Sequence, residues 1–169
     1  MPTVSPARPL PASAAREWGD LDDNSWVLAA PFRAHVAHLM TTTHIPWPII
    51  AYQANVPLAT IRTLLFGRDG RARPKIIRSA ARRILNLTAE DFRWVRVHQV
   101  SAAETGARIR RLRARGVGWE GLSGFLGIDV STCQAIAHGQ HEMCSVMVSA
   151  LARAACELMH AWGSAEDFA

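Results

Sequence analysis

The sequence lacks the features that mark membrane, secreted and disulfide-rich proteins. It has no run of eighteen or more apolar residues, which excludes a membrane-spanning helix of ordinary length. Its first 23 residues contain no apolar core of the signal-peptide type. Its three cysteines are an odd number without scaffold-like spacing, which fits reduced thiols. We therefore expect a cytoplasmic protein with no membrane partner.

Signatures of catalysis are also missing. The chain has no G-x-S-x-G, no phosphate-binding loop and no H-E-x-x-H. Acidic residues are rare in its middle, which disfavours general acid–base chemistry. His138, His141 and Cys144 follow one another at zinc-like spacing near Cys133, but zinc ligands usually come as CxxC or HxxxH pairs. We expect neither an enzyme nor a metal or other cofactor.

What the sequence does have is a segregated charge. Residues 33–115 hold sixteen of the nineteen basic residues and four acids, a net charge of +12 in a chain whose total is +5. The segments on either side are acidic. A basic middle of this kind favours a polyanionic partner, most simply nucleic acid. The alternative is a solvated basic surface in a chain that uses arginine in place of lysine.

The chain divides into segments by composition and periodicity. Nearly half of its 169 residues are hydrophobic, enough for a core in one domain or two small ones. The start is rich in proline and alanine, and helical periodicity begins at Pro31. Thr88 with Asp91 resembles a capping box, and the following 92–100 is either a short strand or an extended linker. We predict a flexible tail at 1–28, a first helical unit at 29–88, a linker at 89–103, a second helical unit at 104–163 and a tail at 164–169.

The second helical unit repeats the first at an offset of 72 residues. Eight positions match without a gap, which indicates an internal duplication. The matched pairs are Trp47 with Trp119, Ile50 with Leu122, Ala51 with Ser123, Val56 with Ile128, Thr60 with Thr132, Ile61 with Cys133, Leu64 with Ile136 and Gly67 with Gly139.

The repeated stretch has the spacing of a helix-turn-helix. Ala51 and Ser123 are the small residues that let two short helices meet, and Asn55 and Gly127 suit a left-handed turn. Apolar residues follow at the positions that hold the second helix on the core. The sequence therefore predicts an all-α protein with two tandem helix-turn-helix units joined by a short linker. An ordinary three-helix packing unit with a similar turn is the alternative.

The second helix of each pair presents polar and small side chains outward, as a major-groove recognition helix does. Arginine can pair bidentately with guanine, glutamine can pair with adenine, and threonine or alanine can pack on a thymine methyl group. The candidate base-reading residues are Ala59, Thr60, Arg62 and Thr63 in the first unit, and Ser131, Gln134, Ala135 and His138 in the second.

Two basic segments are candidates for phosphate contacts. The first follows the first recognition helix directly, and the second places arginines along one face of a helix; a solvated surface is the alternative for both. The candidate phosphate-contacting residues are Arg68, Arg71, Arg73 and Lys75 in the first segment, and Arg108, Arg111 and Arg115 in the second.

The chain resembles lambda-repressor-like helix-turn-helix proteins at 47–67 and again at 119–139. It is similar to the two-unit regulators of actinobacteria and their phages, and within that group to actinophage immunity repressors. The resemblance spans roughly residues 31–162 and is carried by "IPWPIIAYQANVPLATIRTLLFG" and "ETGARIRRLRARGVGWEGLSGFLG". It implies a transcriptional repressor that keeps a prophage silent by occupying phage promoters. Cys133 replaces the usual branched aliphatic residue, and the second recognition helix has no arginine or lysine.

The predicted partner is therefore double-stranded DNA, bound by a monomer on an asymmetric site or by a homodimer. In the dimer, the first unit would read DNA and the second would form the interface. Two other functions remain open: a helical protein-interaction module of the antitoxin type, and a nucleoid-type binder that does not select a sequence.

Overall fold

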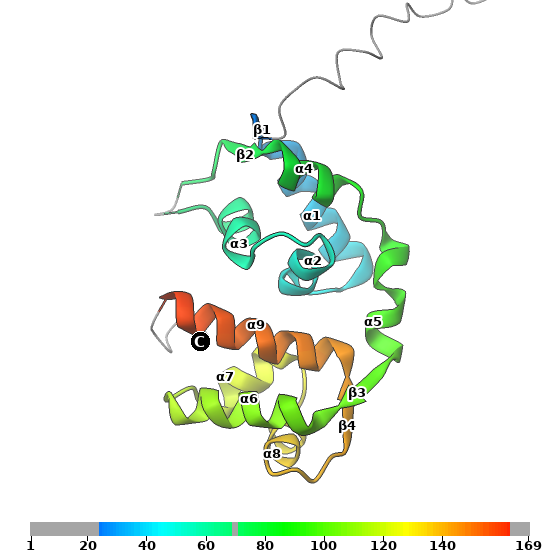
Figure 1. Cartoon of the computed structure of the whole chain (residues 1–169), viewed down its shortest axis with the longest axis vertical. Helices are drawn as coiled ribbons and strands as arrows, with labels where there is room; N and C mark the ends of the chain where they lie inside the picture. Colours follow the sequence, from blue (N-terminus) through cyan, green and yellow to red (C-terminus); the bar gives the residue numbers. More distant parts are fainter. Residues whose placement is uncertain (1–23, 69–70, 163–169) are drawn as a thin grey trace, which may run out of the picture.

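The computed structural model describes residues 24–68 and 71–162. The predicted tail at 164–169 and residues 1–23 of the predicted tail at 1–28 lie outside these residues. The described chain forms two helical bundles stacked along the long axis of the molecule, with α9 running between them (Figure 1). The fold is mostly helical, but it contains two small antiparallel strand pairs, so the all-α description was too narrow.

The first bundle consists of four helices and one strand pair. Strand β1 pairs antiparallel with β2 through Trp26 and Ile77, so residues 26–28 belong to the fold and the predicted tail at 1–28 extends too far. In the strand pair Ile76 is buried and Ile77 is exposed. The elements are β1 (Trp26–Leu28), α1 (Ala30–Thr43), α2 (Trp47–Gln53), α3 (Leu58–Phe66), β2 (Lys75–Ile77) and α4 (Arg78–Leu85).

The expected linker is folded and partly helical. Thr88 and Asp91 form the predicted capping box, in which the Thr88 backbone N–H donates to Asp91 Oδ2 at 2.7 Å. The 3₁₀ helix η1 (Ala89–Phe92) and the helix α5 (Arg93–Val97) follow. Phe92 and Val95 are both buried, and their three-residue spacing suits a helix. The extended form expected here therefore applies only to the end of the segment, at β3 (Gln99–Ser101).

The second bundle repeats the element order of the first. Strand β3 pairs antiparallel with β4 in the same way that β1 pairs with β2. The elements after β3 are α6 (Ala102–Ala114), α7 (Trp119–Leu126), α8 (Val130–Ala137), β4 (Met143–Ser145) and α9 (Val146–Trp162).

Unusual backbone conformations also repeat at the same interval. Three pairs of residues 72 positions apart all have positive φ angles, a conformation that is uncommon outside glycine. The offset falls to 68 at β2 and β4, because the connection before β4 is shorter. The pairs are His44 (φ 51°) with Gly116 (φ 92°), Asn55 (φ 52°) with Gly127 (φ 67°), and Gly67 (φ 76°) with Gly139 (φ 75°).

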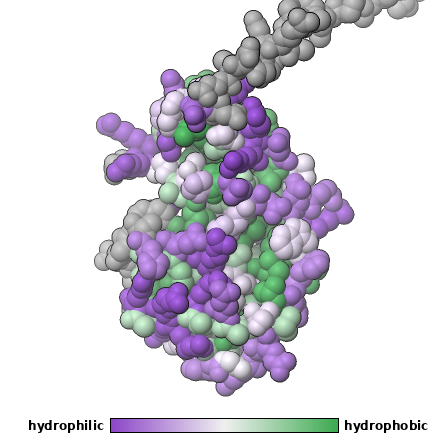
Figure 2. All heavy atoms as spheres, in the orientation of Figure 1, coloured by the Kyte–Doolittle hydropathy of each residue, from purple (hydrophilic) through white to green (hydrophobic). Residues whose placement is uncertain are grey.

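Helix α9 joins the two bundles into one body. It packs against α6 and α7 of its own bundle and against α2 of the other. Buried residues occur on more than one of its faces, so both bundles contribute to a single hydrophobic core. On the face seen in Figure 2, hydrophobic atoms are visible between the upper and lower bundles. The two units are therefore packed together rather than held only by a linker. Among the described residues, no helix combines the length and apolar character needed to cross a bilayer.

Candidate nucleic-acid interface

The turn between α2 and α3 has the geometry that the sequence predicts. Ala51 is fully buried, and its carbonyl oxygen accepts a 2.9 Å hydrogen bond from the Val56 backbone N–H across the turn. Asn55 adopts the left-handed conformation between them. Ile61 and Leu64 are fully buried, which fixes α3 on the bundle and turns its other face outward. These local expectations are confirmed.

The turn between α7 and α8 has the same construction. The Ile128 backbone N–H donates to the Ser123 carbonyl oxygen at 3.1 Å, and Gly127 is left-handed. Cys133 and Ile136 are buried where Ile61 and Leu64 lie in the first unit. Burial raises the pKa of the Cys133 thiol, which keeps it a neutral core residue. Within the described residues, no three His, Cys, Asp or Glu side chains gather as a metal site.

Each outward helix is braced by an aromatic side chain from the start of the preceding helix. The Trp47 ring lies 6.3 Å from the Phe66 ring, and the Trp119 ring lies 6.4 Å from the His138 ring, measured between ring centroids. His138 therefore occupies the position that Phe66 has in the first unit. It is exposed at the end of α8, so packing on Trp119 leaves it open to solvent.

The outward face of α3 carries the four residues predicted to read bases. Ala59 is exposed, and Thr60, Arg62 and Thr63 are partly exposed. The Thr63 hydroxyl donates to the Ala59 carbonyl oxygen at 2.6 Å, so its methyl group and lone pairs remain for an incoming partner. Arg62 is the one charged residue of this helix.

A basic hollow lies beside the end of α3. It has a volume of about 480 Å³, and Thr63 of α3 forms one of its walls. Arg68 and Arg71 hold its rim together by two reciprocal backbone hydrogen bonds of 3.0 Å. Hydrophilic side chains project at the upper left of Figure 2, where Figure 1 shows the connection between α3 and β2. The residues that line the basic hollow are Thr63, Arg68, Arg71, Ala72, Arg73 and Pro74.

This hollow brings together most of the first group of predicted phosphate contacts. Three arginines line it, and Lys75 is exposed in the adjoining strand β2. Guanidinium groups match the geometry of phosphate oxygens, so the arrangement can bind a polyanion next to the outward face of α3.

The outward face of α8 differs chemically from that of α3. Gln134 and Ala135 are partly exposed, whereas Ser131 is turned toward the helix cap. The Ser131 and Thr132 hydroxyls and the Thr132 backbone N–H all donate to the Asp129 carboxylate. These hydrogen bonds, that of Ser131 first, hold the pKa of Asp129 well below its ordinary value. The Ser131 hydroxyl is therefore engaged in capping α8, which weakens its candidacy as a base reader.

The segment that carries α8 also has no basic side chain of the arginine or lysine type, and the positive charges beside α8 come from α6. Residues 116–152 contain no arginine or lysine and have three acids.

The three α6 arginines predicted to contact phosphate lie on the side of the helix that faces α9. The side chain of Arg108 is only 18% exposed and forms an ion pair with Glu104. It lines a hollow together with Tyr52 and Arg153, between the two units. Arg111 and Arg115 are exposed, and Arg115 Nη2 lies 3.4 Å from His160 Nε2 of α9. The regular spacing of these arginines on α6 therefore orients them toward α9.

Two arginines that the sequence did not single out stabilise the ends of the outward helices. Arg33 of α1 donates from Nε to the Leu64 carbonyl oxygen at 2.6 Å and from Nη2 to the Arg73 carbonyl oxygen at 2.9 Å. Arg110 of α6 donates to the Ala137 carbonyl oxygen in the same way. The final carbonyls of a helix have no partner within it, so these guanidiniums satisfy them. The repeat gave no signal for this role, because Gly106 corresponds to Arg33 when Val36 is aligned with Ile109.

Comparison with protein-family models, curated proteins and solved structures yields no match for this chain. Its function is therefore inferred from its own residues and their geometry.

Proposed function

We propose that this protein is a sequence-specific, double-stranded DNA-binding transcriptional repressor that inserts α3 into the major groove. One observation carries the proposal: the outward face of α3, with Thr60, Arg62 and Thr63, adjoins a hollow lined by three arginines. A helix that reads base edges needs phosphate contacts beside it to fix its register. The juxtaposition supplies both.

The two repeated turns support the same function. In each, the backbone N–H after a left-handed residue bonds to the carbonyl of a small, buried residue in the preceding helix. This geometry, together with the buried apolar positions that follow, is what a tandem pair of helix-turn-helix units of the lambda-repressor type requires. The resemblance to actinophage immunity repressors supports repression, rather than packaging of DNA, as the role.

The two units are proposed to contribute unequally. The first unit has an arginine on its outward helix and a basic connection after it. The second has Gln134, Ala135 and His138 outward and no basic residue between 116 and 152. We expect the first unit to supply most of the affinity. The second then either reads a weaker half-site from the same chain or joins two chains.

Selection of binding sites from random duplexes tests the proposal. The full-length protein should enrich one sequence, and that duplex should stay bound in an excess of random duplex. Equal competition by random duplex would indicate a nucleoid-type binder. Absence of binding to any duplex at low salt would favour a protein-interaction module of the antitoxin type.

A further inference from the structure

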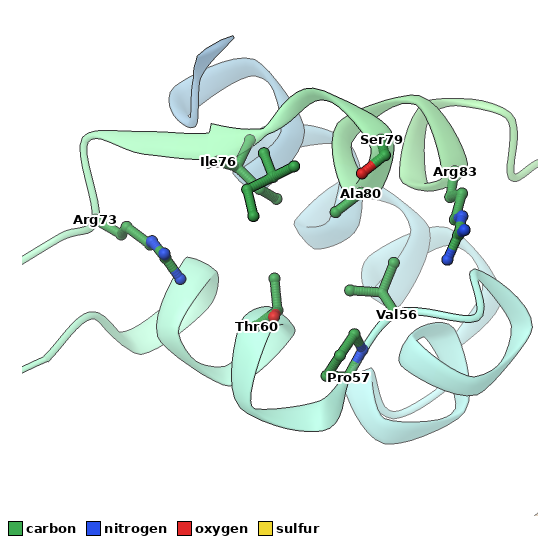
Figure 3. Close-up of a pocket in the computed structure, with 9 residues that line it drawn as sticks. Val56, Pro57, Thr60, Arg73, Ile76, Ser79, Ala80 and Arg83 are labelled. Carbon is green, nitrogen blue, oxygen red and sulfur yellow. The ribbon is translucent and has the colours of Figure 1, made fainter. Parts of the chain in front are cut away.

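A second pocket opens where α3, β2 and α4 meet (Figure 3). Its volume is about 190 Å³. Val56, Ile76 and Ala80 point into it and make its inner surface apolar, and the side chains of Thr60 and Ser79 lie among them. The pocket therefore combines an apolar interior with hydroxyl groups.

Two arginines flank this interior from different elements. Figure 3 shows Arg73 beside the start of β2 and Arg83 on α4, on opposite sides of the pocket. Arg83 Nη1 donates to the Asn55 carbonyl oxygen at 2.9 Å, and the Arg73 guanidinium carbon lies 5.3 Å from the centre of the Trp26 ring. A guanidinium has five N–H donors, so these contacts position both groups and leave donors for a ligand.

The second unit does not conserve this chemistry. At the corresponding positions it has Asp129 in place of Pro57 and Leu151 in place of Arg83. Leu151 is buried in the core, and a carboxylate replaces a neutral residue at the pocket edge. A pocket flanked by two arginines is therefore specific to the first unit. It is not a general consequence of the helix-turn-helix fold that both units share.

We propose that this pocket binds a small organic anion with one carboxylate or phosphate group and a compact apolar body. The anionic group would pair with Arg73 or Arg83, and the body would cover Val56, Ile76 and Ala80. The volume lies below the roughly 300–1,000 Å³ of sites for drug-sized ligands, so the ligand is small. Thr60 lines this pocket and is also a predicted base reader, so the bound anion would also lower DNA affinity, a consequence that rests on the proposed function.

Titration of the DNA-free, full-length protein with benzoate tests the proposal, with amide chemical shifts as the readout. Benzoate should cause saturable shifts at Thr60, Ile76 and Ala80. Benzamide, which keeps the ring but has no charge, should bind about tenfold more weakly, because a hydrogen bond to a charged group is lost. Inorganic phosphate, which has the charge but no apolar body, should also bind more weakly.

Two variants and one control test whether benzoate binds in this pocket. Ala80→Leu fills the pocket and should abolish the saturable shifts, whereas Ala37→Leu adds the same atoms to an exposed position of α1 and should leave them unchanged. Arg73→Gln should weaken benzoate about tenfold. Binding that persists in both Ala80→Leu and Arg73→Gln would overturn the proposal, as would the absence of saturation with wild-type protein.

Equal binding of inorganic phosphate and benzoate would also overturn it. The pocket would then recognise only the negative charge, as a contact with a DNA backbone phosphate does. No DNA is present in these titrations, so their failure leaves the proposed function untouched. Conversely, failure to select a DNA site would leave the anion pocket testable.

Discussion

Arg153 on α9 places its guanidinium carbon 4.8 Å from the centre of the Tyr52 ring on α2, a cation–π contact between the two units. Arg153 Nε also donates to Glu157 Oε1 at 2.8 Å, which orients the guanidinium over the ring. The Tyr52 hydroxyl oxygen is buried without a hydrogen-bond partner of good geometry among the described residues. Burial and the nearby Glu157 carboxylate raise its pKa. The ring, rather than the hydroxyl, therefore joins the units.

The first prediction follows from this contact. Tyr52→Phe keeps the ring and should change the free energy of unfolding by less than about 1 kcal/mol, because the lost hydroxyl makes no good bond. Tyr52→Ala removes the ring from the joint between the units and should lower that free energy by roughly 2–4 kcal/mol. Urea unfolding measures both. Equal losses in the two variants would show that the hydroxyl makes the important contact.

The second prediction concerns base reading by α3. If Arg62 reads a guanine, Arg62→Ala should cost about 1–3 kcal/mol of binding free energy on the selected duplex and relax selection at one base pair. Affinity for every single-base variant of the site measures this. Arg93→Ala is the matched control, because Arg93 is exposed and paired with Glu90 on the connecting segment. Equal weakening on selected and random duplexes would make Arg62 a phosphate contact instead.

The third prediction concerns the basic connection after α3. Each phosphate contact that is lost should reduce the slope of log K against log salt by about 0.9, because fewer counterions are released. A variant with all four basic side chains replaced by alanine should therefore show a much flatter salt dependence. An unchanged slope would exclude this connection from the interface. The residues to replace together are Arg68, Arg71, Arg73 and Lys75.

The fourth prediction separates the two modes of assembly on DNA. A monomer that uses both units reads an asymmetric site, because the outward residues of α3 and α8 differ. Gln134→Ala should then weaken binding at one end of that site. Sedimentation of the complex gives the number of chains. Two chains on a palindrome, with Gln134→Ala without effect on base selection, would establish the dimer in which the second unit forms the interface.

The fifth prediction concerns the cap of α8. The folded-state pKa of Asp129 is lowered, so its contribution to stability is fully present above the unfolded carboxyl pKa of about 3.9 and is lost as the pH falls through the folded value. Asp129→Ala should lower the melting temperature at pH 7, and Asp129→Asn should retain part of the cap. The advantage of wild type over Asp129→Asn should stay constant from pH 7 to about pH 5 and shrink in stronger acid. An advantage that grows on acidification would contradict this assignment.

The sequence by itself determined the local features of this protein. Asn55 and Gly127 mark left-handed turns because few other residues tolerate that backbone. The capping box at Thr88 also forms as predicted, because it needs only residues three apart. The buried positions of α3 and α8 follow from helical periodicity. All of these depend on neighbours close in the chain.

The tertiary structure decided what depends on distant partners. Residues 26–28 form a strand because they pair with β2. Since β2 lies far along the chain, no local sequence pattern predicts this pairing. Arginine side chains are long, so spacing alone could not tell that Arg33 and Arg110 reach helix ends or that Arg108 lies between the units. The packing of α9 against α2 could not be predicted either. An apolar helix face indicates that the helix will be buried, but it does not indicate which element will cover it.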